Sequence, residues 1–323
     1  MRFYFDHNAS SPGSPEALEA FIAAAGGVYG NPSSIHTPGQ TARQTVEAAR
    51  RDLAALLNAS PKEIVFTSGG TEAANLAILG TGARHAIVSA VEHPAVLEAA
   101  KELERRGSEV SLAPVKPDGV VDLDRLRSLL RPDTDLISVM HANNETGALQ
   151  PVEDLAKIAH EAGALLHSDG VQAAGRMPVD VRALGVDLYS ISGHKMGAPK
   201  GSGALYVREG VKLRGQIVGG RHERERRAGT ENVPGIAALG AAARWLLERG
   251  ESEQRRLAAL RDRLEQGALA RIPRIHVNAG AAPRVPNTAN LRFDGLEGEA
   301  LVIALDLAGF AVSTGAACSS GAV

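Results

Sequence analysis

The chain of 323 residues is poor in several features, and each shortage excludes a class of protein. It has one cysteine, Cys318, which excludes an intrachain disulfide and a metal site built from several cysteines. No apolar run reaches the roughly 18 residues that span a bilayer, and the first residues lack the apolar core of a signal peptide. The formal net charge of -2 gives no basic surface for nucleic acid. These absences predict a cytoplasmic protein that binds no metal, membrane or nucleic acid.

Between about residue 60 and residue 210, short apolar segments alternate with amphipathic ones. Strands are predicted for segments rich in valine, isoleucine and leucine, at 63–67, 85–91, 109–115, 135–140, 164–169, 186–192 and 203–209. Most of them are separated by helical patterns. Such alternation is typical of a mainly parallel sheet with helices on both faces. The sequence therefore predicts an α/β fold.

The pattern changes after Gly235. Two helices are predicted, over residues 236–250 and 251–270, and short strands with one further helix follow between residues 274 and 313. These segments indicate a second, smaller unit of the α+β type.

We therefore expect two domains. The larger covers residues 15–235, and the smaller α+β domain combines residues 1–14 with residues 236–323. Because the chain stops inside a loop of small residues, the smaller domain is expected to be incomplete at its C-terminus.

Polar or ionisable side chains follow five predicted strands, at the edge of a parallel sheet where ligands bind. They lie at Ser68 to Thr71, His93, His141 to Glu145, Asp169 to Gln172, and Ser192 to Lys195. One such histidine or aspartate is usually a structural hydrogen-bonding group or a helix cap. Five groups on one edge favour a binding site.

The residue types at this edge indicate a small phosphorylated cofactor. The glycine-rich turn before the helix at residue 70 favours phosphate, yet it lacks the patterns that bind nucleoside triphosphates or dinucleotides. Asp169 could pair with a protonated ring nitrogen, and His93 could stack on an aromatic ring. Lys195, if desolvated, could form a Schiff base. Pyridoxal 5'-phosphate (PLP) fits this combination.

Motifs spread over nearly the whole chain carry a resemblance to a known family. They are GNPSSIH (30–36), FTSGGTEAANLAI (66–78), EHPAV (92–96), MHANNETG (140–147), HSDGVQAAG (167–175), SGHKMGAPKG (192–201), RAGTENV (227–233) and STGAACSSG (313–321). The sequence resembles the cysteine desulfurases of the NifS/IscS type, which are fold type I PLP enzymes of the class V aminotransferase group. The resemblance implies a seven-stranded sheet in a large PLP-binding domain.

The same resemblance implies roles for individual residues. Lys195 forms the Schiff base and moves the substrate's Cα proton, His93 stacks on the ring and shuttles protons, and Asp169 keeps the ring nitrogen protonated. Further cofactor contacts are implied for Gly70, Thr71, Ser192 and His194 at the phosphate, for Gln172 and Asn144 at the phenolic oxygen or the Schiff-base region, and for Thr230 at the phosphate of the partner subunit. The role of Thr230 implies a homodimer.

Cys318 lies among serine, glycine and alanine residues, which leave the backbone free to move. A buried structural cysteine is expected among larger apolar residues, and an inert cysteine is the alternative. In the family, a cysteine here takes the sulfur of L-cysteine as a persulfide, and L-alanine is released. The sulfur then passes to an acceptor protein, such as an iron–sulfur cluster scaffold, for cluster or thiolated-cofactor assembly.

Asn31 and Arg227 are the predicted substrate contacts. Arg227 lies in a run of charges that, taken alone, is typical of a solvated surface. In the family, an arginine-bearing loop at this place lies near the active site. No residue up to Val323 corresponds to the family's arginine that binds the substrate carboxylate.

Two other functions stay open beside a PLP-dependent cysteine desulfurase. One is another PLP reaction on this fold, such as a selenocysteine lyase, another lyase or an aminotransferase. The thiol argues against a plain aminotransferase but not against selenocysteine cleavage. The other is a catalytically inactive scaffold that binds sulfur acceptors, which a missing C-terminal part would explain.

Overall fold

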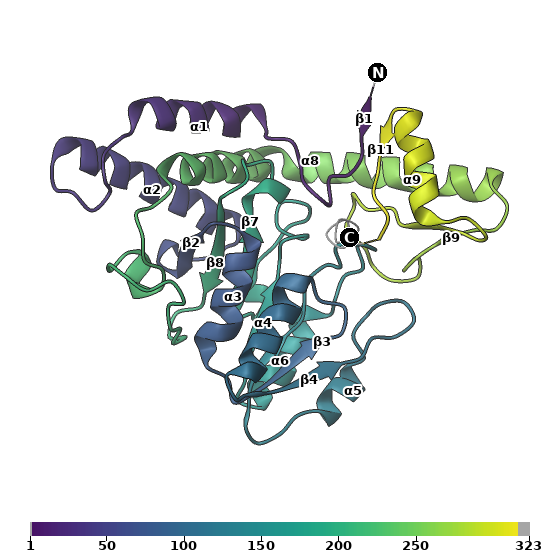
Figure 1. The fold of residues 1–323 in the computed structure, drawn as a ribbon, viewed down its shortest axis with the longest axis horizontal. Helices are drawn as coiled ribbons and strands as arrows, with labels where there is room; N and C mark the ends of the chain where they lie inside the picture. Colours follow the sequence, from purple (N-terminus) through teal and green to yellow (C-terminus); the bar gives the residue numbers. More distant parts are fainter. Residues whose placement is uncertain (1, 316–323) are drawn as a thin grey trace.

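The computed structural model describes residues 2–315, and their centre is a seven-stranded sheet (Figure 1). Across the sheet the strands are β2 (Ile64–Thr67), β8 (Gly203–Val207), β7 (Leu188–Ser192), β6 (Leu165–Asp169), β5 (Thr134–Ser138), β3 (His85–Ser89) and β4 (Glu109–Ala113). Strand β8 is antiparallel to β2 and β7, whereas the neighbours from β7 to β4 are parallel. The predicted α/β fold with a mainly parallel sheet is confirmed.

Helices cover both faces of this sheet. On one face lie α3 (Gly70–Thr81) and α4 (Pro94–Arg105), whose apolar residues form two core clusters with the strands. On the other face, α2 (Thr37–Leu56), α6 (Val152–Glu161) and α8 (Val233–Arg271) share the largest core cluster. Every residue of β2, β3, β7 and β8 is buried. Burial on both faces explains why these strands have nearly continuous apolar sequences.

The start of the chain pairs with a segment near its other end. Strand β1 (Phe3–Tyr4) is parallel to β11 (Phe310–Ala311), while β9 (Ile275–Val277) is antiparallel to β10 (Leu291–Phe293). In Figure 1 these strands and helix α9 (Gly298–Leu307) gather beside one half of α8. The division into domains at residues 15–235 stays a prediction.

Helix α8 differs from the sequence-based expectation. The prediction of two helices that meet after Gly250 was wrong, because one helix runs from Val233 to Arg271. A glycine inside a helix costs only about 1 kcal/mol, and the residues on both sides are good helix formers. The first part of α8 also packs on α2 and on α1 (Pro15–Gly27).

The remaining helices are short. They are α5 (Leu123–Ser128) and α7 (Val181–Leu184), with 3-10 turns η1 (Pro61–Glu63), η2 (Gly193–Lys195) and η3 (Glu223–Glu225). Within residues 2–315, no helix has both the length and the apolar character needed to cross a membrane.

Candidate active site

Lys195 ends the turn η2, directly after strand β7. Its ammonium group donates hydrogen bonds to two main-chain carbonyls, that of Asn8 and that of Ala9, the latter at 2.8 Å. The predicted Schiff-base lysine is therefore held against the N-terminal segment. This contact joins residues that are far apart in the sequence.

Asp169 is the last residue of β6 and is buried. Its Oδ1 accepts a hydrogen bond of 2.9 Å from the backbone N–H of Val171. Burial raises the pKa of Asp169 to about 6, and the Val171 N–H and the charge of Lys195 both oppose this rise. Asp169 and Lys195 thus interact electrostatically at neighbouring strand ends.

The residue after Asp169 has to be glycine. A Cβ atom on Gly170 would lie 2.0 Å from the ring of Tyr189, a distance that no side chain tolerates. The hydroxyl of that tyrosine is in turn 2.8 Å from Nδ1 of His141. The close approach of the ring to the backbone therefore fixes the turn that follows Asp169.

A polar ladder crosses the sheet two residues before Asp169. The imidazole of His167 lies between the hydroxyls of Ser138 on β5 and Ser190 on β7, at 2.8 and 2.9 Å. Burial lowers the pKa of His167 to about 3, so the ring is neutral at pH 7. The ladder holds three strand ends in register and sets the position of Asp169.

His93 caps the N-terminus of α4 and is partly buried. Its Nδ1 accepts a hydrogen bond of 3.1 Å from the backbone N–H of Ala95, so the neutral ring carries its proton on Nε2. Burial lowers the pKa of His93, and the positive charge of Lys195 lowers it further. The structure therefore places His93 and Lys195 in the same site.

Of the predicted phosphate-binding residues, Gly70, Thr71 and Ser192 lie at the start of α3, whereas His194 contacts the N-terminal segment. A Cβ atom on Gly70 would lie 2.8 Å from Val171 and 3.4 Å from Ser192, so glycine permits this close approach. Among residues 2–315, no side chain caps the first turn of α3. His194 is 3.2 Å from the hydroxyl of Ser10. Thr71 is exposed in the same first turn.

Asn8 connects several predicted residues, although its sequence context did not single it out. Its side-chain amide donates to the carbonyl of Asn144 at 3.2 Å, and its own carbonyl accepts from Gln172 at 3.0 Å. Its Oδ1 accepts from Arg176 at 2.7 Å. No local pattern reveals these contacts, because Asn8 lies more than a hundred residues from each partner in the chain.

Glu92 is a second residue that the sequence analysis missed. Its Oε1 accepts hydrogen bonds of 2.6 Å from the hydroxyl of Ser89 and from the backbone N–H of Met140. Burial raises the pKa of Glu92 to about 8, and the charge of Asp169 adds to this rise. The two carboxyl groups at this edge of the sheet therefore hold a single negative charge near pH 7.

Glu92 makes the stability of the protein depend on pH. Its folded pKa lies above the unfolded value, so the folded form binds the proton more tightly and loses stability as the pH rises towards about 8. Relative to Glu92→Gln, which has no such proton, we expect the wild type to lose roughly 1.4 kcal/mol per pH unit over this range.

Urea unfolding of the cofactor-free protein at about pH 5, 7 and 9 measures this difference. The exposed Glu98, which is ion-paired with Lys101, provides the control Glu98→Gln. Its free energy of unfolding is expected to run parallel to that of the wild type. Parallel curves for Glu92→Gln as well would contradict the assignment.

The remaining predicted residues lie at the margin of the cluster or outside it. Arg227 forms an ion pair with Glu72, in the first turn of α3, at 2.9 Å. It lines a pocket of about 220 Å³ together with Thr230 and Ser68. Asn31 is exposed, and its Oδ1 accepts a hydrogen bond from the backbone of Ser33. The substrate roles of Asn31 and Arg227 stay predictions, as does the contact of Thr230 with a partner subunit.

Cys318 lies outside the described residues. Its distance from Lys195 and its role as sulfur acceptor therefore stay predictions from the sequence.

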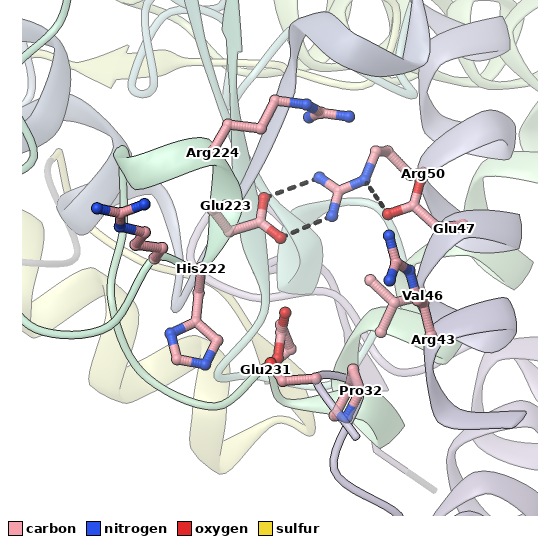
Figure 2. Close-up of a pocket in the computed structure, with 11 residues that line it drawn as sticks. Pro32, Arg43, Val46, Glu47, Arg50, His222, Glu223, Arg224 and Glu231 are labelled. Atoms are coloured by element: carbon pink, nitrogen blue, oxygen red, sulfur yellow. Dashed lines mark hydrogen bonds and ion pairs between the residues drawn. The ribbon is translucent and has the colours of Figure 1, made fainter. Parts of the chain in front are cut away.

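A separate pocket of about 310 Å³ lies between α2 and residues 221–231. Figure 2 shows the guanidinium of Arg50, on α2, facing the carboxylate of Glu223. Two hydrogen bonds of 2.6 and 2.8 Å join these groups, and Glu223 also accepts from the backbone N–H of Phe66 on β2. Neither Lys195 nor His93, the two predicted catalytic residues that the structure describes, lines this pocket.

The sequence matches a known protein family over nearly its whole length. The family model "Aminotransferase class-V" matches residues 3–323. A protein named cysteine desulfurase from Trichormus azollae is 47% identical over 325 residues, which cover 99% of this chain and 81% of that protein.

Solved structures give the same family. A NifS-like protein superposes with a TM-score of 0.93 and 39% identity, over 97% of this chain and 88% of the other. A structure described as SspA in complex with cysteine has a TM-score of 0.86 and 32% identity, over 99% of this chain and 91% of the other.

Proposed function

The chain belongs to the class V aminotransferase family and is a cysteine desulfurase, and from this premise we propose the residues that carry out its reaction. The reaction converts L-cysteine to L-alanine and leaves the sulfur as a persulfide. The observation that supports the assignment most strongly is that Lys195 interacts electrostatically both with Asp169, at the end of the neighbouring strand β6, and with His93, which follows β3 at the same edge of the sheet. The start of α3, with Gly70 beside Ser192, completes the site.

The residues at these strand ends fit PLP. The uncapped first turn of α3 would hold the phosphate with the hydroxyl of Ser192, because free N–H groups and the helix dipole attract an anion. Asp169 would pair with the ring nitrogen, and Lys195 supplies the amine that binds the aldehyde. When bound, PLP supplies an electron sink that stabilises negative charge on the α-carbon of an amino acid.

Two residues of the chain hold the protons that the reaction needs. The neutral amine of Lys195 takes the substrate's Cα proton, and the main-chain carbonyls of residues 8 and 9 orient this amine. His93 carries a proton on Nε2, since its Nδ1 is occupied by the backbone of α4. Its lowered pKa keeps the ring neutral at pH 7, with Nε2–H as the group that can donate, and the ring can take up a second proton at Nδ1 only if the hydrogen bond from Ala95 is released.

Cys318 is the proposed sulfur acceptor. Its thiolate attacks the sulfur of the substrate, so that an S–S bond forms while the substrate's Cβ–S bond breaks. Cβ then takes up a proton, and alanine leaves. We further propose a homodimer through the segment of Thr230, a cytoplasmic location, and an acceptor protein such as an iron–sulfur cluster scaffold.

The alternatives from the sequence are less well supported. The relative from Trichormus azollae is named as a cysteine desulfurase, not as a selenocysteine lyase or an aminotransferase. An inactive scaffold would have no need for a lysine, an aspartate and a histidine held together at one edge of the sheet.

The release of alanine and sulfide from L-cysteine tests the proposed function. With PLP-loaded protein and a reductant, we expect equal amounts of both products. Replacement of Cys318 by serine is expected to lower both by roughly 10³-fold or more, because the nucleophile is lost, while PLP still binds. An absence of both products from PLP-loaded wild type would contradict the function, and unchanged release by Cys318→Ser would contradict the role of Cys318.

A further inference from the structure

Arg176 is a buried cation whose hydrogen-bond partners among the described residues are all neutral. It lies in the segment that follows β6 and Asp169, and the residue is 8% exposed. Its Nη1 donates to Oδ1 of Asn8 at 2.7 Å and to Oε1 of Gln172, and its Nη2 donates to the carbonyl of His7 at 2.8 Å. Within residues 2–315, no carboxylate forms an ion pair with it.

Such an arrangement is unusual, since buried charges in proteins are normally paired. Burial lowers the pKa of Arg176 to about 10, so the group is still charged at pH 7. Its charge also contributes to the lowered pKa values of His7 and His194, after the larger effect of burial. The site therefore contains a positive charge that no described carboxylate balances.

Arg176 also fixes the orientation of the Gln172 amide. Because the guanidinium donates to Oε1, that oxygen faces Arg176. One N–H of Nε2 donates to the carbonyl of Asn8 at 3.0 Å. The second N–H is the remaining polar group of this amide, so Gln172 offers a ligand a donor and not an acceptor.

These contacts connect the buried charge of Arg176 to the remaining N–H of the Gln172 amide. We propose that Arg176 is a positioning residue that acts through Gln172 to stabilise negative charge on the phenolic oxygen of bound PLP. The inference rests on the proposed function, since it assumes that PLP binds with this oxygen near Gln172. Arg176 itself contacts Gln172, Asn8 and His7 and not the ligand. An amide that accepts a hydrogen bond from a cation is polarised by it, so its N–H gives a stronger hydrogen bond to an anionic oxygen than the N–H of an isolated amide.

The test compares the affinities of two ligands for the cofactor-free protein. One ligand is PLP, and the other is the analogue that lacks the ring hydroxyl. For Arg176→Met, which is similar in length but uncharged, we expect PLP to bind roughly 10-fold more weakly, as for the loss of one charge-assisted hydrogen bond. The analogue is expected to bind the variant and the wild type equally.

A second readout separates charge from geometry. The pH midpoint of the absorbance change of bound PLP is expected to rise by about one unit in Arg176→Met, because loss of a positive charge favours protonated forms. The other titratable groups that face this region are His7, His194, Lys195 and Asp169. In Arg176→Lys the midpoint stays near that of the wild type, while PLP affinity recovers only in part, since lysine has no second nitrogen for the carbonyl of His7 and lacks the rigid planar shape of the guanidinium.

The possible outcomes distinguish the inference from the proposed function. Equal weakening of PLP and the analogue would indicate a structural role of Arg176 and overturn the inference, as would unchanged binding of both. If Arg176→Met does not fold, Arg176→Lys is measured instead. A loss of affinity for PLP alone would then support the inference, and an equal loss for PLP and the analogue would overturn it. A wild type that binds no PLP overturns the proposed function, and the inference fails with it.

Discussion

Replacement of Lys195 by alanine is expected to reduce the release of alanine and sulfide by about 10⁴-fold. The substitution removes the amine that binds the cofactor's aldehyde and that takes the Cα proton, and general acid–base catalysis alone contributes roughly 10²- to 10⁴-fold. The variant is expected to fold, since Lys195 is only partly buried and its ammonium contacts main-chain carbonyls. A discontinuous assay of alanine, run over hours, covers the range of rates.

Lys200 provides a matched control for this experiment. It lies in the same glycine-rich loop, five residues further on, but is exposed. We expect Lys200→Ala to keep its activity within about twofold of the wild type, as for a surface substitution. Treatment with borohydride in the presence of PLP is expected to label the wild type and Lys200→Ala but not Lys195→Ala. Residual desulfuration by Lys195→Ala at a tenth of the wild-type rate would be incompatible with the assigned role.

The second large effect concerns stability. Replacement of Glu223 by alanine is expected to lower the free energy of unfolding by roughly 3–5 kcal/mol, because it removes the buried carboxylate that pairs with the guanidinium of Arg50. Of the described carboxylates, Glu47 then remains, at 3.0 Å from Nε, but it is partly exposed and does not reach the two terminal nitrogens. The backbone N–H of Phe66 also loses its acceptor. Glu223 also has a φ of 44°, in the left-handed region, but this is unfavourable for alanine as well as for glutamate, so the backbone is expected to contribute little to the loss.

Glu225 lies two residues further on and separates these effects. It also has a positive φ, of 66°, but its carboxylate pairs with Arg221 at the surface. Urea unfolding followed by circular dichroism is expected to give a loss below about 1 kcal/mol for Glu225→Ala, as is usual for exposed ion pairs. If Glu223→Ala does not fold, Glu223→Gln retains the shape of the side chain and carries the comparison. Similar losses for the residue-223 and residue-225 variants would rule out a special role for the buried pair.

The sheet could be predicted from the sequence because each strand is recognisable from the apolar residues in its own short segment. A strand buried on both faces reads as an apolar run, and polar side chains after it mark the edge where ligands bind. Lys195, Asp169 and His93 were found in this way. Helix α8 was predicted wrongly, since Gly250 looks like an end signal and only packing on α1 and α2 shows otherwise.

Residues that act through distant partners could not be predicted. Asn8, Arg176 and Glu223 are ordinary polar residues in the sequence, and their importance arises from contacts with segments far along the chain. Glu92 stands next to a recognised histidine, yet only its burial distinguishes it from a surface glutamate. A single glutamate in a sequence does not indicate whether its side chain is buried.

The pairing of β1 with β11 has a consequence for the synthesis of the protein. Phe3 pairs with Phe310, so the ribosome must add about 300 residues before the partner strand exists. At the usual rates of translation this takes roughly 15 to 60 s. During that time the aromatic residues 3–5 have no β11 to pack against, while the central sheet can already form. Residues 8 and 9, whose carbonyls accept hydrogen bonds from Lys195, adjoin this strand. Their position is therefore fixed by the β1–β11 pairing only late in synthesis.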